Sequence, residues 1–198
     1  MWTWSLNWGR ITDDIVIGTC PMTTDDLRRI RSEAVASGIL SLQHDDCLAY
    51  WGIDYEPMHR FGTGIGLRME RCPIRDFDRA DMRRRLPEAV SSLSKMISNG
   101  HRVYVHCTAG MGRSPLTVLG YLSFVRGYSP DAAIRLIRAE RPEAVPSWEA
   151  FDGCMADLTE QNRGAIEQRA YALYESGVNE SPYKDWVQAR AEVLASLF

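Results

Sequence analysis

Short apolar runs alternate with longer amphipathic stretches along the first half of the chain. Most of the runs are rich in Val, Ile and Leu and end at a Gly or a polar residue, which is typical of buried strands. After the first run, Thr23 precedes Asp25 and Asp26 in the pattern of a capped helix, which is expected to end near Ser37. This order predicts a right-handed crossover and a parallel sheet. We expect strands at residues 14–18, 39–43, 67–72 and 103–106.

Helical periodicity dominates the second half of the chain. The last two helices, separated by a turn at residues 176–181, present apolar faces but supply no second core. The pattern predicts an α/β fold over residues 1–160, with a central, mostly parallel sheet flanked by helices. A helical C-terminal extension over residues 161–198 is expected to pack on it. We expect helices at about residues 81–98, 113–125, 129–138, 146–157, 165–175 and 182–197.

Two segments between the expected strands have no clear periodicity. Residues 45–54 are polar but contain Tyr50 and Trp51, and we expect a loop or a short helix there. Composition alone favours the core for both aromatic side chains. The glycines of residues 62–66 follow no strand and open no helix, so we interpret them as a flexible turn and not as a dinucleotide site.

Composition and charge exclude several classes of protein. The chain has 198 residues, of which 45% are apolar and 25% charged, as in an ordinary globular domain. Its net charge of −3 argues against nucleic acid as a partner. We also expect no membrane partner, because no apolar run approaches the length of a membrane span. The first eight residues lack the features of a targeting signal, so we expect a cytoplasmic protein, or a plastid protein if a transit peptide has been removed.

Cysteines and histidines give no sign of a metal site. The five cysteines include no Cys-x-x-Cys pair and the four histidines are scattered, so we expect no metal and no cofactor. The odd number of cysteines fits a reducing compartment. If Cys107 were oxidised, a second thiol could trap it as a disulfide, and the candidates for that thiol are Cys20, Cys47 and Cys72.

The segment 103–115 carries the strongest chemical signal. A predicted strand ends at His106, a loop of small residues follows, and a helix begins near Arg113. This Cys-x5-Arg-Ser order is typical of the phosphate loop of cysteine-dependent phosphatases. A phosphate dianion needs inward-facing N–H groups, and successive N–H groups before a helix N-terminus can provide them. The residues expected to bind phosphate are Thr108, Ala109, Gly110, Met111, Gly112 and Arg113.

Specific roles follow for the side chains and glycines of this loop. Gly110 and Gly112 are expected to adopt backbone angles that a Cβ would forbid. Cys107 is the expected nucleophile, because the field that binds phosphate also stabilises a thiolate. Arg113 offers a planar two-pronged donor, and Ser114 can hydrogen-bond the sulfur as it leaves. His106 is expected to support the loop, not to act as a base.

A general acid should come from the acidic loop before the helix expected at residues 81–98. A cysteine phosphatase needs such an acid to protonate the leaving oxygen and then to activate water. The candidates are Asp76, Asp78 and Asp81. Asp81 is expected to be the helix N-cap, and composition alone does not decide between Asp76 and Asp78.

The loop His106–Arg113 resembles the signature of the glucan phosphatases, a branch of the dual-specificity phosphatases. The resemblance covers nearly the whole chain and implies the cysteine-phosphatase fold, a phosphocysteine intermediate and phosphate monoesters of starch or glycogen as substrates. It assigns the general acid to Asp76 and glucan contacts to Tyr50, Trp51 and Phe77. Similar sequence segments occur at Leu42–Gln43, Tyr50–Asp54, Ile74–Asp78, Arg85–Pro87, Arg126–Tyr128 and Asp185–Trp186.

The chain departs from parts of this branch. Ser41 stands where a plant relative has a regulatory Cys, Ser114 stands where some have Ala, and no aromatic follows Pro142 until Trp148. The uncharged loop interior argues against phosphoinositide substrates, and no carbohydrate-binding module is visible.

Two other functions remain open. One is a dual-specificity protein phosphatase acting on phospho-Ser, phospho-Thr or phospho-Tyr, which would share every catalytic residue and make phosphoproteins partners. The other is a non-catalytic scaffold that binds glucan. The expected partners are phosphorylated glucan chains.

Overall fold

A five-stranded sheet forms the centre of the computed structural model, which describes residues 3–198. Met1 and Trp2, part of the N-terminal segment in which no targeting signal is expected, lie outside the described residues. The strands are β1 (Trp8–Arg10), β2 (Ile15–Gly18), β3 (Gly38–Gln43), β4 (Arg68–Ile74) and β5 (Val103–His106). Their order across the sheet is β1-β2-β5-β3-β4, and every pair except the antiparallel β1–β2 is parallel. The expected mostly parallel sheet is therefore confirmed.

The register of the sheet brings three strand ends together. β5 lies between β2 and β3, and His106 pairs with Gly18 on one side and with Ser41 on the other. All residues of these three strands are buried, which explains why their sequences are continuous apolar runs without alternation. The chain segments that follow β2, β3 and β5 therefore start beside one another at the carboxyl ends of these strands. Parallel α/β folds place their ligand-binding sites there.

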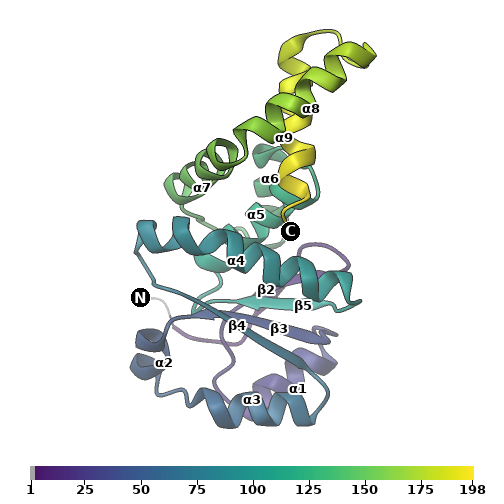
Figure 1. The fold of residues 1–198 in the computed structure, drawn as a ribbon. Helices are drawn as coiled ribbons and strands as arrows, with labels where there is room; N and C mark the ends of the chain where they lie inside the picture. Colours follow the sequence, from purple (N-terminus) through teal and green to yellow (C-terminus); the bar gives the residue numbers. More distant parts are fainter. Residues whose placement is uncertain (1–2) are drawn as a thin grey trace.

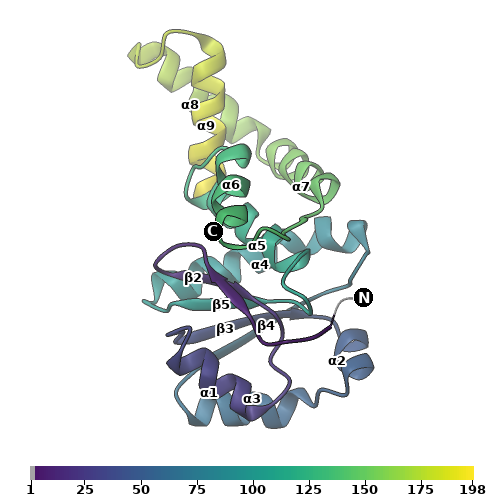
Figure 2. The same ribbon diagram turned by 180° about the vertical axis from the view of Figure 1, so that it is seen from behind.

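Helices cover both faces of the sheet (Figures 1 and 2). One face carries α1 (Thr24–Ser32), α2 (Asp45–Trp51) and α3 (Tyr55–Gly64). The other face carries α4 (Arg79–Ser98), α5 (Arg113–Gly120), the π-helical segment η1 (Tyr121–Val125), α6 (Pro130–Glu140) and α7 (Trp148–Gln161). No helix among residues 3–198 has the length and apolarity that crossing a lipid bilayer requires.

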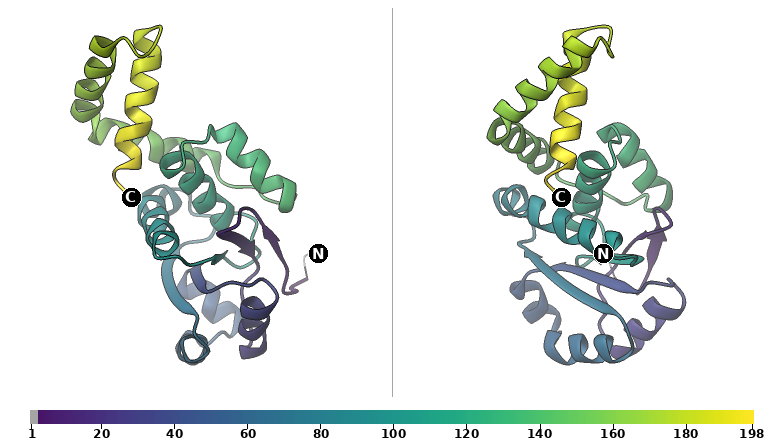
Figure 3. Two further views of the ribbon diagram at one scale, coloured as in Figure 1. Left: turned by 90° about the vertical axis from the view of Figure 1, so that its right-hand side faces the viewer. Right: turned by 45° about the vertical axis from the view of Figure 1, so that its right-hand side comes forward.

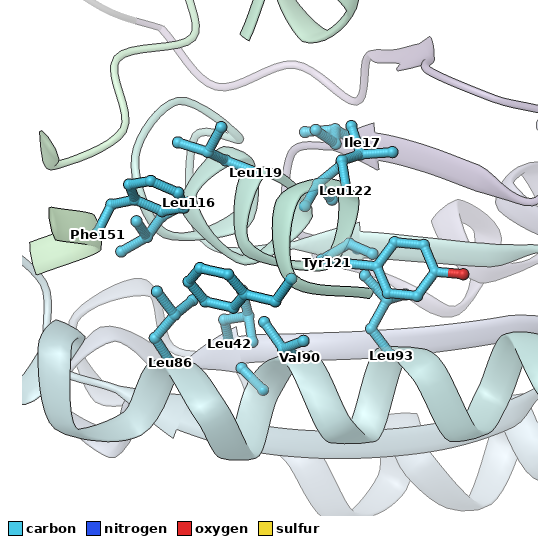
Figure 4. Close-up of a cluster of buried hydrophobic side chains, with 14 of the residues drawn as sticks. Ile17, Leu42, Leu86, Val90, Leu93, Leu116, Leu119, Tyr121, Leu122 and Phe151 are labelled. Atoms are coloured by element: carbon cyan, nitrogen blue, oxygen red, sulfur yellow. The ribbon is translucent and has the colours of Figure 1, made fainter. Parts of the chain in front are cut away.

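The largest hydrophobic cluster lies between the sheet and the helices α4 and α5 (Figure 4). Gly120 is needed there, because a Cβ on it would come within 2.8 Å of Val90 on α4. Each fully buried Leu or Ile in such a cluster contributes about 1.5–3 kcal/mol. The cluster therefore fixes α5, whose first residue is Arg113. Its members include Ile17, Leu42, Leu86, Val90, Leu93, Leu116, Leu119, Leu122 and Phe151.

The chain ends in an antiparallel pair of helices, α8 (Arg163–Ser176) and α9 (Pro182–Ala195), that projects from the rest of the molecule (Figures 1 and 3). The pair has a small apolar cluster of its own, formed by Ile166, Leu173 and Ala189. Its final residues return to the main body, where Leu194 joins the central cluster and the Phe198 ring stacks 6.1 Å from Phe124.

Several expected elements differ in the structure. Helix α1 ends at Ser32 and not near Ser37, because Val35 adopts a left-handed backbone with φ of 53°. Of the expected turn at residues 62–66, residues 62–64 are instead the end of helix α3, and only Ile65 and Gly66 form a turn. A Cβ on Gly62 would meet Met69 of β4 at 2.6 Å. Strand β4 extends past Pro73, which the edge of a sheet tolerates. Residues 121–125 are π-helical where an α-helix was expected, and strand β1 was not expected at all.

Candidate active site

The loop between β5 and α5 turns its carbonyl groups outward. The carbonyl oxygens of residues 107–111 all accept hydrogen bonds from groups that lie around the outside of the loop. In a planar trans peptide the C=O and the following N–H point in opposite directions, so this arrangement aims N–H groups at the centre of the loop. The partners, in order, are His106 Nδ1 at 2.9 Å, Cys20 N at 3.0 Å, Arg141 Nη2 at 2.8 Å, Arg141 Nε at 3.1 Å and Val145 N at 2.7 Å.

The two glycines of the loop differ in backbone conformation and in the space around them. Gly110 adopts φ of 70°, and a Cβ on it would lie 2.6 Å from the carbonyl oxygen of Gly18. Gly112 has φ of −109° and nothing lies within 4 Å of its position for a Cβ. The expectation that a Cβ is forbidden is confirmed for Gly110 and wrong for Gly112.

Cys107 lies under this ring of amides. Burial on its own raises the pKa of the Cys107 thiol, but the Arg113 guanidinium and donors from Ser114 and Gly110 hold the pKa below its ordinary value. The Ser114 hydroxyl lies 3.4 Å from the sulfur. Burial lowers the pKa of His106 to about 4, so this imidazole is neutral and hydrogen-bonds the Cys107 carbonyl.

The guanidinium of Arg113 is wholly buried next to the loop. Its Nη1 donates to the Ile74 carbonyl at 2.9 Å and to the Cys47 sulfur at 3.3 Å. Its Nη2 donates to Asp76 at 2.7 Å and to the Thr108 hydroxyl at 3.2 Å. Within the described structure its Nε–H has no hydrogen-bond partner. A buried donor without a partner is costly, and an anion bound over Cys107 would satisfy it.

The three candidate acids have separate places. Asp78 is the N-cap of α4 and accepts from the Asp81 N–H at 2.9 Å. Asp81, expected to be the cap, is instead three residues into the helix, where it is buried and accepts from the Arg75 N–H at 2.8 Å. The expectation that Asp81 is the N-cap of this helix is therefore wrong. Asp76 lies two residues before the N-cap Asp78, and its carboxylate accepts from Arg113 Nη2.

Aromatic side chains line the surface beside the loop. Tyr50 and Trp51 lie on α2 with their rings 5.4 Å apart, Tyr50 is 82% exposed and Trp51 is half-buried. The core placement that composition favours is therefore wrong for both. They line a groove of about 640 Å³ that also reaches Asp76, Phe77 and Thr108. Phe77 is 92% exposed and has φ of 59°, a strained backbone for an aromatic residue.

A second groove of about 680 Å³ adjoins the first and shares Asp76, Phe77, Ala109 and Met111 with it. Trp148 and Val145 line it together with Cys107, and Phe77 borders both grooves. Sequence reasoning did not assign a role to Trp148, although it is the first aromatic after Pro142. It also missed Arg141, because contacts to a loop thirty residues earlier leave no local pattern. Among the described residues, no group of three or more His, Cys, Asp or Glu side chains could hold a metal ion.

The thiols should differ sharply in reactivity. Burial raises the pKa values of Cys20, Cys72 and Cys154 to about 12, whereas the pKa of Cys107 is lowered. At a pH below the ordinary pKa of a thiol, iodoacetamide should therefore label Cys107 in preference to these three. Peptide mapping by mass spectrometry measures the labelling.

Ser114→Ala provides the control for this labelling. The Ser114 hydroxyl favours the thiolate, so its loss raises the pKa of Cys107 and should move the labelling curve to higher pH. Labelling of Cys107 only at the pH where the buried thiols react would contradict the activated thiolate.

Comparison with known proteins identifies a family for this architecture. Residues 57–160, just over half of the chain, match the family described as "Dual specificity phosphatase, catalytic domain". The chain is 37% identical over 155 residues to "Phosphoglucan phosphatase DSP4, amyloplastic" of Castanea sativa, covering 77% of this chain and 41% of that protein. It is 31% identical over 153 residues to "Phosphoglucan phosphatase LSF1, chloroplastic" of Arabidopsis thaliana, covering 74% and 25%. It is 27% identical over 179 residues to laforin of Mus musculus, covering 85% and 54%.

The chain thus spans less than two thirds of the length of each of these relatives. Among solved structures, it resembles PTPMT1 with a TM-score of 0.60 and 22% identity, covering 74% of this chain and 90% of that one. It resembles the human tyrosine phosphatase-like serine/threonine/tyrosine-interacting protein with a TM-score of 0.62 and 15% identity, covering 78% and 97%. These likenesses confirm the cysteine-phosphatase fold. The resemblance to the glucan phosphatase branch is likewise confirmed, and the chain belongs to the dual-specificity phosphatase family.

Proposed function

We propose that this protein is a cysteine-dependent phosphatase that removes phosphate monoesters from phosphorylated α-glucan. The observation that carries the proposal is the buried Arg113, whose Nε–H has no hydrogen-bond partner within residues 3–198 and lies beside an activated Cys107. Grooves lined with exposed aromatic side chains flank this pair. The phosphoglucan phosphatases among the relatives support the substrate class.

In the first step the Cys107 thiolate attacks phosphorus. A sulfur–phosphorus bond forms while the bond from phosphorus to the sugar oxygen breaks. The loop N–H groups and the guanidinium of Arg113 hold the three equatorial oxygens of the phosphate, and this fixed positive field stabilises the transition state. Asp76, in its acid form, gives its proton to the departing sugar oxygen.

In the second step water releases phosphate from the phosphocysteine. Asp76, now a carboxylate, takes a proton from the water as its oxygen attacks phosphorus. The sulfur–phosphorus bond breaks and the electron pair returns to Cys107 as a thiolate. The Ser114 hydroxyl, 3.4 Å from the sulfur, donates a hydrogen bond to that leaving thiolate.

The ion pair between Arg113 and Asp76 places the general acid beside the phosphate site. Arg113 Nη2 donates to the Asp76 carboxylate at 2.7 Å. A phosphate dianion competes for the same donor because it carries more charge and fits the guanidinium fork. Binding of the phosphate therefore releases the Asp76 side chain to turn toward the departing sugar oxygen.

The surface around the loop supports a sugar polymer as substrate. Sugar rings have apolar C–H faces that pack on aromatic rings, and Tyr50, Trp51 and Phe77 present such rings at the groove. The two grooves adjoin at Phe77 and together give a surface on which a chain can extend past the phosphorylated residue. The loop interior from Thr108 to Gly112 carries no charged side chain to meet further phosphates.

Phosphate release from phosphorylated amylopectin or glycogen, compared with a panel of phosphopeptides, tests the substrate class. We expect kcat/KM to be higher on the glucans. Trp51→Ala should lower the glucan value by roughly tenfold through lost stacking, and should leave p-nitrophenyl phosphate unaffected. Tyr183→Ala, an exposed aromatic on α9, is the matched control and should change neither.

Other outcomes would redirect the proposal. If Trp51→Ala lowered both activities equally or neither, and phosphopeptides were the better substrates, the protein would be a protein phosphatase. An intact protein without aryl phosphatase activity would be a glucan-binding scaffold. Two relatives are named as amyloplastic and chloroplastic, which supports a plastid location, while the cytoplasmic location expected from the sequence stays a prediction.

A further inference from the structure

Arg141 is a cation buried behind the phosphate loop. Its side chain is only 4% exposed, although it follows directly on helix α6 at the molecular surface. Burying a guanidinium is unfavourable unless its donors are satisfied. Here Nε donates to the Gly110 carbonyl at 3.1 Å and Nη2 to the Ala109 carbonyl at 2.8 Å, while Nη1 donates to the Asn7 side chain at 2.5 Å. Glu143 lies 3.4 Å from Nη1 and supplies the counter-charge.

These contacts fix the direction of two loop peptides. The Ala109 carbonyl shares its peptide plane with the Gly110 N–H, and the Gly110 carbonyl shares its plane with the Met111 N–H. Because each plane is rigid, drawing the carbonyls toward Arg141 turns both N–H groups toward the centre of the loop. The Gly110 N–H is also one of the donors that lower the pKa of Cys107. One peptide plane therefore connects Arg141 to the nucleophile.

Neighbouring residues support the contact between Arg141 and the phosphate loop. A Cβ on Gly110 would lie 2.7 Å from Arg141 Nη2, so the close approach depends on glycine. Asn7, which accepts from Arg141, is itself fixed to Thr19 by two hydrogen bonds of 3.1 Å. Cys20, which follows Thr19 in the chain, donates its N–H to the Thr108 carbonyl at 3.0 Å. The segment before β1 and the end of β2 thus brace the same loop that Arg141 holds.

We propose that Arg141 is a positioning residue for dephosphorylation, which holds the Ala109 and Gly110 carbonyls outward so that the loop amides face phosphate and Cys107. This inference rests on the proposed function, and it adds a residue that touches neither substrate nor sulfur. A guanidinium is required, since only its fork can reach two consecutive carbonyls and Asn7 together.

The test uses Arg141→Lys, which keeps the charge but loses the fork. We expect kcat on p-nitrophenyl phosphate to fall by about 10- to 100-fold, because amides that drift from the centre stabilise the transition state less. The iodoacetamide labelling curve of Cys107 should move to higher pH, because the thiolate loses the well-aimed Gly110 N–H. Arg135→Lys, an exposed arginine on α6, is the matched control and should change neither quantity.

A purely structural role predicts a different result, namely a lower melting temperature with an unchanged labelling curve and unchanged kcat per folded molecule. Wild-type kcat and a wild-type labelling curve in folded Arg141→Lys would overturn the inference.

Should the Arg141→Lys variant fail to fold, Asn7→Ala decides in its place. It frees one edge of the guanidinium without changing any residue of the loop, and because Arg141 is then held less firmly, it must shift both readouts in the same direction by a smaller amount. A wild-type protein inactive on aryl phosphate would defeat the proposed function, and the labelling curves would still test Arg141.

Discussion

Replacing Cys107 with serine should abolish turnover. The substitution exchanges an activated thiolate for a hydroxyl that remains protonated, so kcat on aryl phosphate is expected to fall on the order of 10⁴-fold or more. Cys154→Ser is the matched control, because burial raises the pKa of that thiol to about 12 and it lies in α7 away from the loop. Retained activity in Cys107→Ser, measured as phosphate release, would remove the nucleophile assignment.

The same variant should still bind phosphate. The amides and Arg113 that receive the anion are unchanged, and the negative thiolate that repels a dianion is gone. We therefore expect isothermal titration with inorganic phosphate to give affinity equal to or tighter than that of the wild type. Weaker binding in Cys107→Ser would mean that the loop geometry itself depends on the sulfur.

Replacing Asp76 with alanine should produce a loss that depends on the leaving group. A sugar alkoxide is a poor leaving group and needs a proton, whereas p-nitrophenolate leaves without one. Loss of a general acid is therefore expected to cost about 10²- to 10⁴-fold on glucan phosphate and much less on p-nitrophenyl phosphate. Affinity for inorganic phosphate should rise at the same time, because the guanidinium of Arg113 no longer has a competing carboxylate.

Asp78→Ala is the matched control, since it lies two residues away on the same loop. It removes the N-cap of α4 and should lower stability by about 1 kcal/mol, seen as a lower denaturation midpoint, without a leaving-group effect. If Asp78→Ala showed the leaving-group dependence and Asp76→Ala did not, the general acid would be Asp78.

Local patterns predicted the central strands and the loop well. The strands that meet at the site are continuous apolar runs, and their burial on both faces is what makes such runs recognisable. The segment from Cys107 to Ser114 is contiguous, so its residue types, glycine turn and following helix can be recognised together. These features depend on neighbours in sequence, and for that reason they needed no structure.

Features that depend on distant contacts were missed. Strand β1 has only three residues and includes Gly9, where a Cβ would lie 2.3 Å from the Glu140 carbonyl oxygen. Helix α3 likewise contains Gly62, because a Cβ at that position would collide with the Met69 side chain. The roles of Asp78 and Asp81 could be separated only once the start of α4 was known. Arg141 carries no local signal, because its partners lie at Asn7, Ala109 and Gly110.

The sources of the loop's outer hydrogen bonds have a consequence for biosynthesis. The groups that hold the carbonyls come from sequence positions as far apart as Cys20 and Val145, so a nascent chain whose residues near 141–145 are still inside the ribosome cannot complete them. Until then no guanidinium holds the Ala109 and Gly110 carbonyls outward, and the Gly110 N–H that helps to lower the pKa of Cys107 is not yet fixed. The full activation of the sulfur is thereby deferred until translation has passed residue 145.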